Sequence, residues 1–137
     1  MKLAVGIGCD RGTPLETLQQ ALSEALALAG ATLVEVVAAA SIDLKRDEPG
    51  IQALAEIHCW NVIFYPAAEL AAVPVPHPSE TVRRHTGTPS VAEAAALLSA
   101  GADMTHLVVE KHKLRGADGR NATISIARIL HDHFPTP

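Results

Sequence analysis

The segment His85–Leu97, HTGTPSVAEAAAL, places hydroxyl and glycine residues directly in front of an alanine-rich stretch. Ser90 and Glu93 have the spacing of a capping box, in which two side chains satisfy backbone N–H groups at the start of a helix. Capping needs one hydroxyl group, so it leaves Gly87 and Thr88 unexplained. Backbone N–H groups at a helix N-terminus attract anions. The segment therefore predicts a helix from about residue 90 to 99 with an anion site at its start.

A second candidate site follows the first apolar run of the chain, KLAVGIG. Glycines after a strand let backbone N–H groups approach a ligand closely, and arginine is a natural fork for carboxylate or phosphate. The spacing matches neither the dinucleotide fingerprint nor the P-loop. A tight strand-to-helix turn would also explain these glycines, and Cys9 also fits a small buried residue. The candidate ligand-binding residues are Gly6, Gly8, Cys9, Arg11 and Gly12.

A third polar loop, SIDLKRDEPG, concentrates charge between a β-rich run and a proline that opens a helix. A helix cap explains Glu48, which comes directly before Pro49. Lys45 is flanked by carboxylates in a loop that we expect to face a crevice, so a solvated loop explains it less well. We therefore add Asp43, Lys45 and Asp47 to the candidate ligand-binding residues.

Composition excludes several classes of partner. A net charge of −4 without a basic stripe argues against duplex binding, and 3% aromatic residues argue against base stacking. No apolar run approaches the roughly 20 residues of a membrane span, and two cysteines fit a reducing cytoplasm. The seven histidines form no recognised zinc spacing. We therefore expect a cytoplasmic protein that binds no nucleic acid, membrane, metal or cofactor.

The elements that must position these loops alternate between strand and helix. This order predicts a single α/β domain of three layers, with a mostly parallel sheet closed by a C-terminal antiparallel hairpin. Ligands of such sheets sit beyond the carboxyl ends of the strands, where the loops GCDRG and SIDLKRDEPG should meet. We expect the domain to span residues 1–130 and residues 131–137 to form a frayed tail. The expected strands are 2–8, 33–42 and 61–66, the hairpin is 104–114 with 122–130, and the other helices begin at 14 and 49.

Five segments together resemble the CobE/CbiG C-terminal domain family of cobalamin biosynthesis, over about Val5 to Arg128. They are GIGCDRG, SIDLKRDEPG, VPHPSETVRRHTGTPSVAEAAAL, VEKHK and NATISIARI. The resemblance is greatest to the stand-alone form, which implies a role in the aerobic pathway. It also implies an anionic tetrapyrrole intermediate, a precorrin, as the ligand. Arg11, Lys45 and Lys111 would then hold its acetate and propionate arms, with the helix start at Thr88–Ser90.

Three functions remain open at this point. The chain could catalyse a hydrolase-type step on a precorrin, namely lactone opening or release of a two-carbon fragment, with His85 as the base and the Thr88–Ser90 amides as an oxyanion site. It could instead bind a precorrin without chemistry, or dock on another cobalamin-pathway enzyme. It could also be a structural domain whose small-residue helix packs on a partner. We rank binding slightly above catalysis, and the structural role last.

Overall fold

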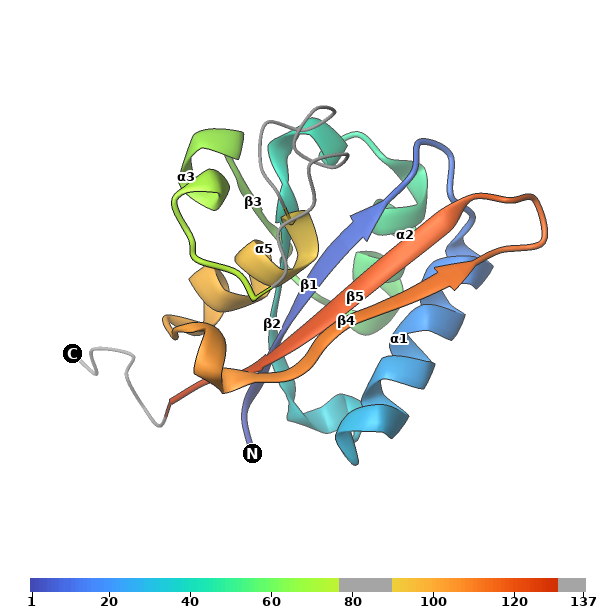
Figure 1. The fold of residues 1–137 in the computed structure, drawn as a ribbon. Helices are drawn as coiled ribbons and strands as arrows, with labels where there is room; N and C mark the ends of the chain where they lie inside the picture. The colour runs from blue at the N-terminus through green and yellow to red at the C-terminus, as the bar shows by residue number, and fades with distance from the viewer. Residues whose placement is uncertain (77–89, 131–137) are drawn as a thin grey trace.

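The computed structural model describes residues 1–76 and 90–130. They form one five-stranded mixed sheet in the order β3-β2-β1-β5-β4. The first three strands are parallel, whereas β5 runs antiparallel to both β1 and β4. The predicted α/β class and the C-terminal hairpin are therefore confirmed (Figure 1). The strands are β1 (Leu3–Cys9), β2 (Val36–Ile42), β3 (Ile63–Tyr65), β4 (Leu107–Arg115) and β5 (Asn121–Arg128).

Helices cover both faces of this sheet, which gives the expected three layers (Figure 1). On one face α1 packs against β4, β5 and α2, and on the other α5 packs against β1, β2, β5 and α3. The helices are α1 (Leu15–Ala29), α2 (Pro49–His58), α3 (Ala67–Ala71) and α5 (Val91–Ala100). Short 3-10 turns are η1 (Leu33–Glu35), η2 (Asp43–Lys45) and η3 (Met104–His106).

The central strand β1 is apolar along its length because both of its faces are covered. Leu3, Val5 and Ile7 are fully buried in the cluster that faces α1, while Ala4 packs in the cluster that contains Ala96 of α5. A strand buried on both sides needs a continuous apolar run, not an alternating pattern. The run KLAVGIG therefore specifies the centre of the sheet.

Gly6 sets how closely α5 approaches β1. A Cβ atom at Gly6 would lie 1.8 Å from the carbonyl oxygen of Ala92 and 2.7 Å from the backbone nitrogen of Ala96. Real Cβ atoms do not come so close to backbone atoms, so only glycine permits this contact. Gly6 thereby fixes the helix whose first turn lies above the carboxyl end of β1.

The C-terminal ends of the helices follow the sequence signals better than their N-terminal ends do. Gly30 and Gly101 end α1 and α5 in the left-handed conformation, at φ 65° and φ 64°, the position where glycine is favoured after a helix. The side-chain caps expected from Glu48 at α2 and from Ser90 at α5 are wrong, since neither makes a cap hydrogen bond. Ser90 does occupy the N-cap position of α5, but both side chains have other partners.

Candidate functional site

The loops after β1 and β2 meet at the carboxyl end of the parallel strands, as expected (Figure 1). The Arg11 guanidinium joins them. Its Nη1 donates to Asp47 Oδ1 at 2.8 Å, and its Nη2 donates to the carbonyl oxygen of Leu44 at 2.6 Å. Hydrogen bonds and the positive charge of Arg11 hold the pKa of Asp47 below its usual range. Arg11 therefore clamps two loops together while most of its side chain, 59%, stays exposed.

Glu48 also joins these two loops, through a buried carboxylate. Its side chain is 3% exposed, and both carboxylate oxygens accept from the backbone N–H of Gly12, at 3.0 and 3.1 Å. Gly12 has φ +77°, a conformation that favours glycine. Gly12 therefore serves the turn, and its N–H group is already occupied by a carboxylate of this chain.

Cys9 ends β1 beside this corner. Burial raises the pKa of its thiol to about 11, although the nearby positive charge of Lys45 acts in the opposite direction. A thiol at that value is neutral at physiological pH and is a poor nucleophile. The interpretation of Cys9 as a small half-buried residue is therefore the better one.

Lys45 differs from Arg11 in its partners. It lies in η2 directly after β2 and is half-buried. Within residues 1–76 and 90–130 its ammonium group makes no hydrogen bond or ion pair, although its charge acts on Cys9 and Asp47. Asp43, in the same turn, is also half-buried. Lys45 thus supplies positive charge to this end of the sheet.

A second cluster lies at the start of α5. Glu93, in the first turn, is fully buried, and its Oε1 accepts from the Ser90 hydroxyl at 2.5 Å. The ammonium group of Lys111 reaches the same oxygen at 3.1 Å. Lys111 therefore points to the α5 face of the sheet, whereas the adjacent His112 bonds Glu24 of α1 on the opposite face.

The other oxygen of this buried carboxylate has no donor in ranges 1–76 and 90–130. Among the described residues, Glu93 Oε2 is a buried side-chain oxygen without a hydrogen-bond partner. An unsatisfied buried polar group costs about 1–3 kcal/mol, and more when it is charged. A buried ion pair adds little stability compared with apolar residues of similar size. Packing alone therefore does not explain why an acid occupies this position.

Sequence reasoning treated Glu93 as half of a capping box and did not include it among the site residues. A second signal was present in the sequence. Glu93 is the only charged residue of VAEAAALLSA, a helix that is apolar almost all round and is therefore expected to be buried. A carboxylate in such a helix must be buried with it, which identifies Glu93 as an unusual group.

Gly8 lies between the two clusters. A Cβ atom there would be 3.9 Å from the backbone nitrogen of Ala92 in α5 and 3.8 Å from the Cβ of Thr123 in β5. The carboxyl end of β1 is therefore beside the first turn of α5. Of the predicted site residues, Cys9, Arg11, Gly12, Lys45 and Asp47 gather in one cluster, and Ser90 and Lys111 in the other. His85, Gly87 and Thr88 lie outside the described residues.

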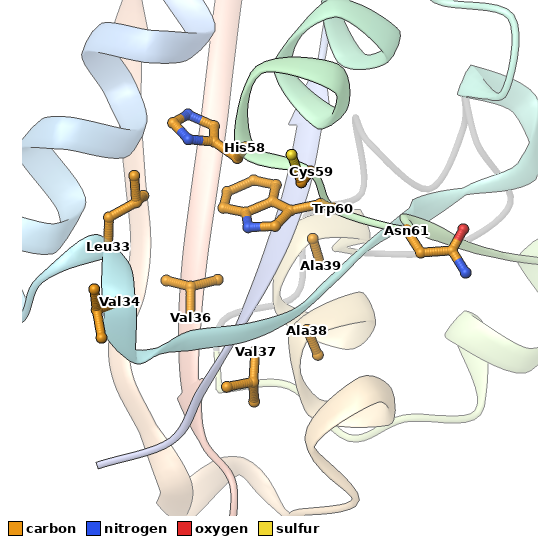
Figure 2. Close-up of a pocket in the computed structure, with 10 residues that line it drawn as sticks. All are labelled: Leu33, Val34, Val36, Val37, Ala38, Ala39, His58, Cys59, Trp60 and Asn61. Atoms are coloured by element: carbon orange, nitrogen blue, oxygen red, sulfur yellow. The ribbon is translucent and has the colours of Figure 1, made fainter.

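A pocket of about 540 Å³ opens elsewhere, at the beginning of β2 and the end of α2 (Figure 2). Its His58 and Trp60 rings lie 4.8 Å apart, and its lining contains no lysine or arginine. It contains none of the predicted site residues and does not suit an anionic ligand. The lining is Leu33, Val34, Val36, Val37, Ala38, Ala39, His58, Cys59, Trp60 and Asn61.

Two further properties of the described residues bear on function. No three histidine, cysteine or carboxylate side chains in ranges 1–76 and 90–130 gather as a metal site would require. No helix in those ranges is both long enough and apolar enough to cross a bilayer.

The chain is similar in sequence to two known proteins. The chain is 36% identical over 130 residues to the cobalt-precorrin-5A hydrolase of Priestia megaterium, a match covering 95% of this chain and 33% of that protein. It is 40% identical over 111 residues to the protein CobE of a Sinorhizobium species, covering 80% of this chain and 71% of that protein. The chain thus spans about a third of the hydrolase.

A solved structure agrees in fold. The crystal structure of CobE, a protein from the cobalamin (vitamin B12) biosynthetic pathway, superimposes with a TM-score of 0.80 at 40% identity and covers 94% of both chains. The family model described as cobalamin synthesis G C-terminus matches residues 3–127. This match begins at the start of β1, includes all but the last residue of β5, and includes both polar clusters. The chain therefore belongs to the cobalamin synthesis G C-terminal family.

Proposed function

We propose that this chain binds a precorrin-type tetrapyrrole intermediate of cobalamin biosynthesis through its carboxylate arms. The observation that carries the proposal is the position of Lys45, a half-buried cation at the carboxyl end of β2 without a hydrogen bond or ion pair to any described residue. Ammonium groups at such positions are ready to bind anions. Arg11 and Lys111 place further positive charge around the same end of β1.

The family supports the same ligand class. One relative is named for a cobalt-precorrin, and the other relative and the solved structure carry the name CobE. Precorrins are macrocycles with several acetate and propionate arms, so separated cations suit them better than one concentrated patch does. The binding site includes the corner of Arg11 and Lys45 and the first turn of α5.

Spectroscopic titration with two corrinoids tests this proposal. Cobyrinic acid carries free carboxylate arms, whereas in cobinamide the arms are amides. We expect cobyrinic acid to bind at low salt, to weaken as salt rises because exposed charges are screened, and cobinamide to bind at least tenfold more weakly. Equal affinity for the two, or no binding of cobyrinic acid, contradicts the proposal.

Two substitutions locate the site. We expect Arg11→Ala and Lys45→Ala to weaken the binding of cobyrinic acid about tenfold each while the melting temperature stays close to that of the wild type. Arg11 is exposed and Lys45 is half-buried, and substitutions near the surface have small effects on folding. A large fall in melting temperature with unchanged affinity would assign these residues to structure instead.

A hydrolytic step is the second candidate, and the name of the hydrolase relative favours it. In that function the same cluster binds a precorrin, and a base activates water against its lactone. Mass spectrometry of a precorrin incubated with the chain distinguishes the two candidates, because lactone opening adds one water. An accessory role, in which the chain delivers the intermediate to another cobalamin-pathway enzyme, leaves the ligand mass unchanged.

A further inference from the structure

The buried carboxylate at the start of α5 has one oxygen with hydrogen-bond donors and one oxygen without a donor among the described residues. Ser90 and Lys111 both donate to Glu93 Oε1, whereas Oε2 has no donor among the described residues. Fully buried acceptors are nearly always satisfied in folded proteins, so an exception needs a specific reason. The reason must involve a donor that the described chain does not supply.

Packing among the described residues gives no reason for a charged group at Glu93. It is the only charged residue of α5, a ten-residue helix that otherwise contacts β1, β2 and β5 through small and apolar side chains. The backbone of the same helix is held against Gly6, so the first turn cannot move to find another donor without losing that contact. The position of Oε2 is therefore fixed beside the carboxyl end of β1.

We propose that Glu93 is a ligand-binding residue whose Oε2 accepts a hydrogen bond from an N–H or O–H group of the tetrapyrrole. This inference rests on the proposed function and adds the residue that recognises a donor beside the anionic arms. Lys111 pairs with Glu93 Oε1, which also accepts from the Ser90 hydroxyl, and the positive charge of Lys111 attracts a neighbouring carboxylate arm. Because Glu93 is fully buried, the ligand displaces covering atoms when it binds.

Glu93→Gln tests the role of Oε2 with little change in shape. Ser90 and Lys111 both donate to the Oε1 position, so the amide oxygen occupies that side and the amide NH2 replaces Oε2. The substitution thus presents a donor where the ligand also presents a donor. Glu93→Asp is the second variant, because it keeps the charge but withdraws the carboxylate by one methylene.

Titration with two corrinoids of equal arms measures the effect. Cobyrinic acid has cobalt on its ring nitrogens, whereas hydrogenobyrinic acid is metal-free and keeps a ring N–H. We expect both variants to lose about tenfold in affinity for hydrogenobyrinic acid, the size of one lost hydrogen bond to a charged group. A loss confined to that ligand identifies the ring N–H as the donor, and an equal loss for both identifies an arm whose carboxyl group is bound in its protonated form.

Controls separate this inference from the function on which it rests. Glu24→Gln removes a carboxylate on the opposite face of the sheet and should leave both affinities unchanged. The melting temperature of each variant shows whether it is folded at the temperature of titration. If the wild type binds neither corrinoid, the proposed function fails. If the wild type binds and both Glu93 variants bind equally well, only the role of Glu93 fails.

Discussion

Two clusters of charge lie at the same end of the sheet, and they differ in how completely the protein satisfies them. Around Arg11, Asp47 and Glu48, each charged group has a partner from the neighbouring loop. Around Glu93, a fully buried carboxylate has one oxygen without any described donor. In the first cluster these groups fasten two loops, and Lys45 is the group without a described hydrogen bond or ion pair; in the second cluster that group is a buried carboxylate oxygen. Charge density alone therefore does not locate a ligand site, but charged groups without a described partner do.

The largest expected effect comes from separating α5 from the sheet. Gly6→Ala would place a Cβ atom 1.8 Å from the carbonyl oxygen of Ala92, so backbone must move. We expect a loss of about 3 kcal/mol or more in the free energy of unfolding, because overpacking against backbone cannot be relieved by rotating a side chain. Urea unfolding followed by circular dichroism measures it.

Gly8→Ala is the matched control for that substitution. Its Cβ atom would make ordinary contacts of 3.8 and 3.9 Å, and we expect a change of about 1 kcal/mol or less. Equal losses for the two alanine variants would show that the close approach of α5 is not what makes glycine necessary at position 6.

The next effect comes from breaking the buried ion pair. Lys111→Met removes the cation and leaves the fully buried Glu93 carboxylate without charge compensation. Removing one member of a buried pair costs about 3 kcal/mol. We expect the double variant Glu93→Leu with Lys111→Met to recover most of that loss, since neither charge is then left buried. Thermal and urea unfolding of the single and double variants measure the recovery.

If the double variant did not recover stability, the comparison between the two clusters would change. If the double variant were as unstable as Lys111→Met alone, the pair would be needed for folding, and Glu93 would resemble Glu48 in function. Recovery of stability together with loss of corrinoid binding is the pattern expected of a site that the fold does not require.

A smaller effect is expected at the loop cluster. Glu48→Ala removes the acceptor of the Gly12 N–H from a side chain that is 3% exposed. We expect a loss of about 2 kcal/mol, the range for hydrogen bonds to charged groups. Asp47→Ala is the control, because that side chain is 80% exposed and should matter little for stability. An equal effect of the two substitutions would contradict the assignment of Glu48 as the fastening residue.

The architecture could be predicted from sequence because its signals are local. The continuous apolar run of β1, the left-handed glycines at 30 and 101, and the two strand-like runs before the tail each specify an element within a few residues. The fold class follows from alternating helices and strands together with the final hairpin. The meeting of the first two loops then follows from the rule for parallel strands.

The partners of the acidic residues could not be predicted in the same way. Glu48 and Glu93 both precede or begin a helix, and local spacing assigned both to capping. In the structure Glu48 bonds Gly12, 36 residues earlier, and Glu93 pairs with Lys111 of β4. Both partners come from distant parts of the chain, so tertiary contacts override the local preference. The sequence pattern can identify a buried acid but not which groups surround it.

The smallest expected effect concerns Cys9, which belongs to the loop cluster and should react slowly. Burial raises its thiol pKa from 9.0 to about 11, so at pH 8 the reactive thiolate is about a hundredfold scarcer than in an unperturbed thiol. Cys59 is exposed, and both cysteines are free thiols. We expect iodoacetamide at pH 8 to label Cys59 first, as followed by intact mass.

The raised pKa of Cys9 also predicts how its labelling rate changes with pH. Because folding raises the pKa of Cys9, the stability due to its neutral thiol is present below about pH 9 and is lost as pH rises from 9 to about 11. In a Cys59→Ser variant, labelling of Cys9 should therefore accelerate over that range. Lys45→Ala in the same background should slow it further, because the charge of Lys45 favours the thiolate. Fast labelling of Cys9 at pH 8 in folded protein would mean that its thiol belongs to the reactive groups of the site.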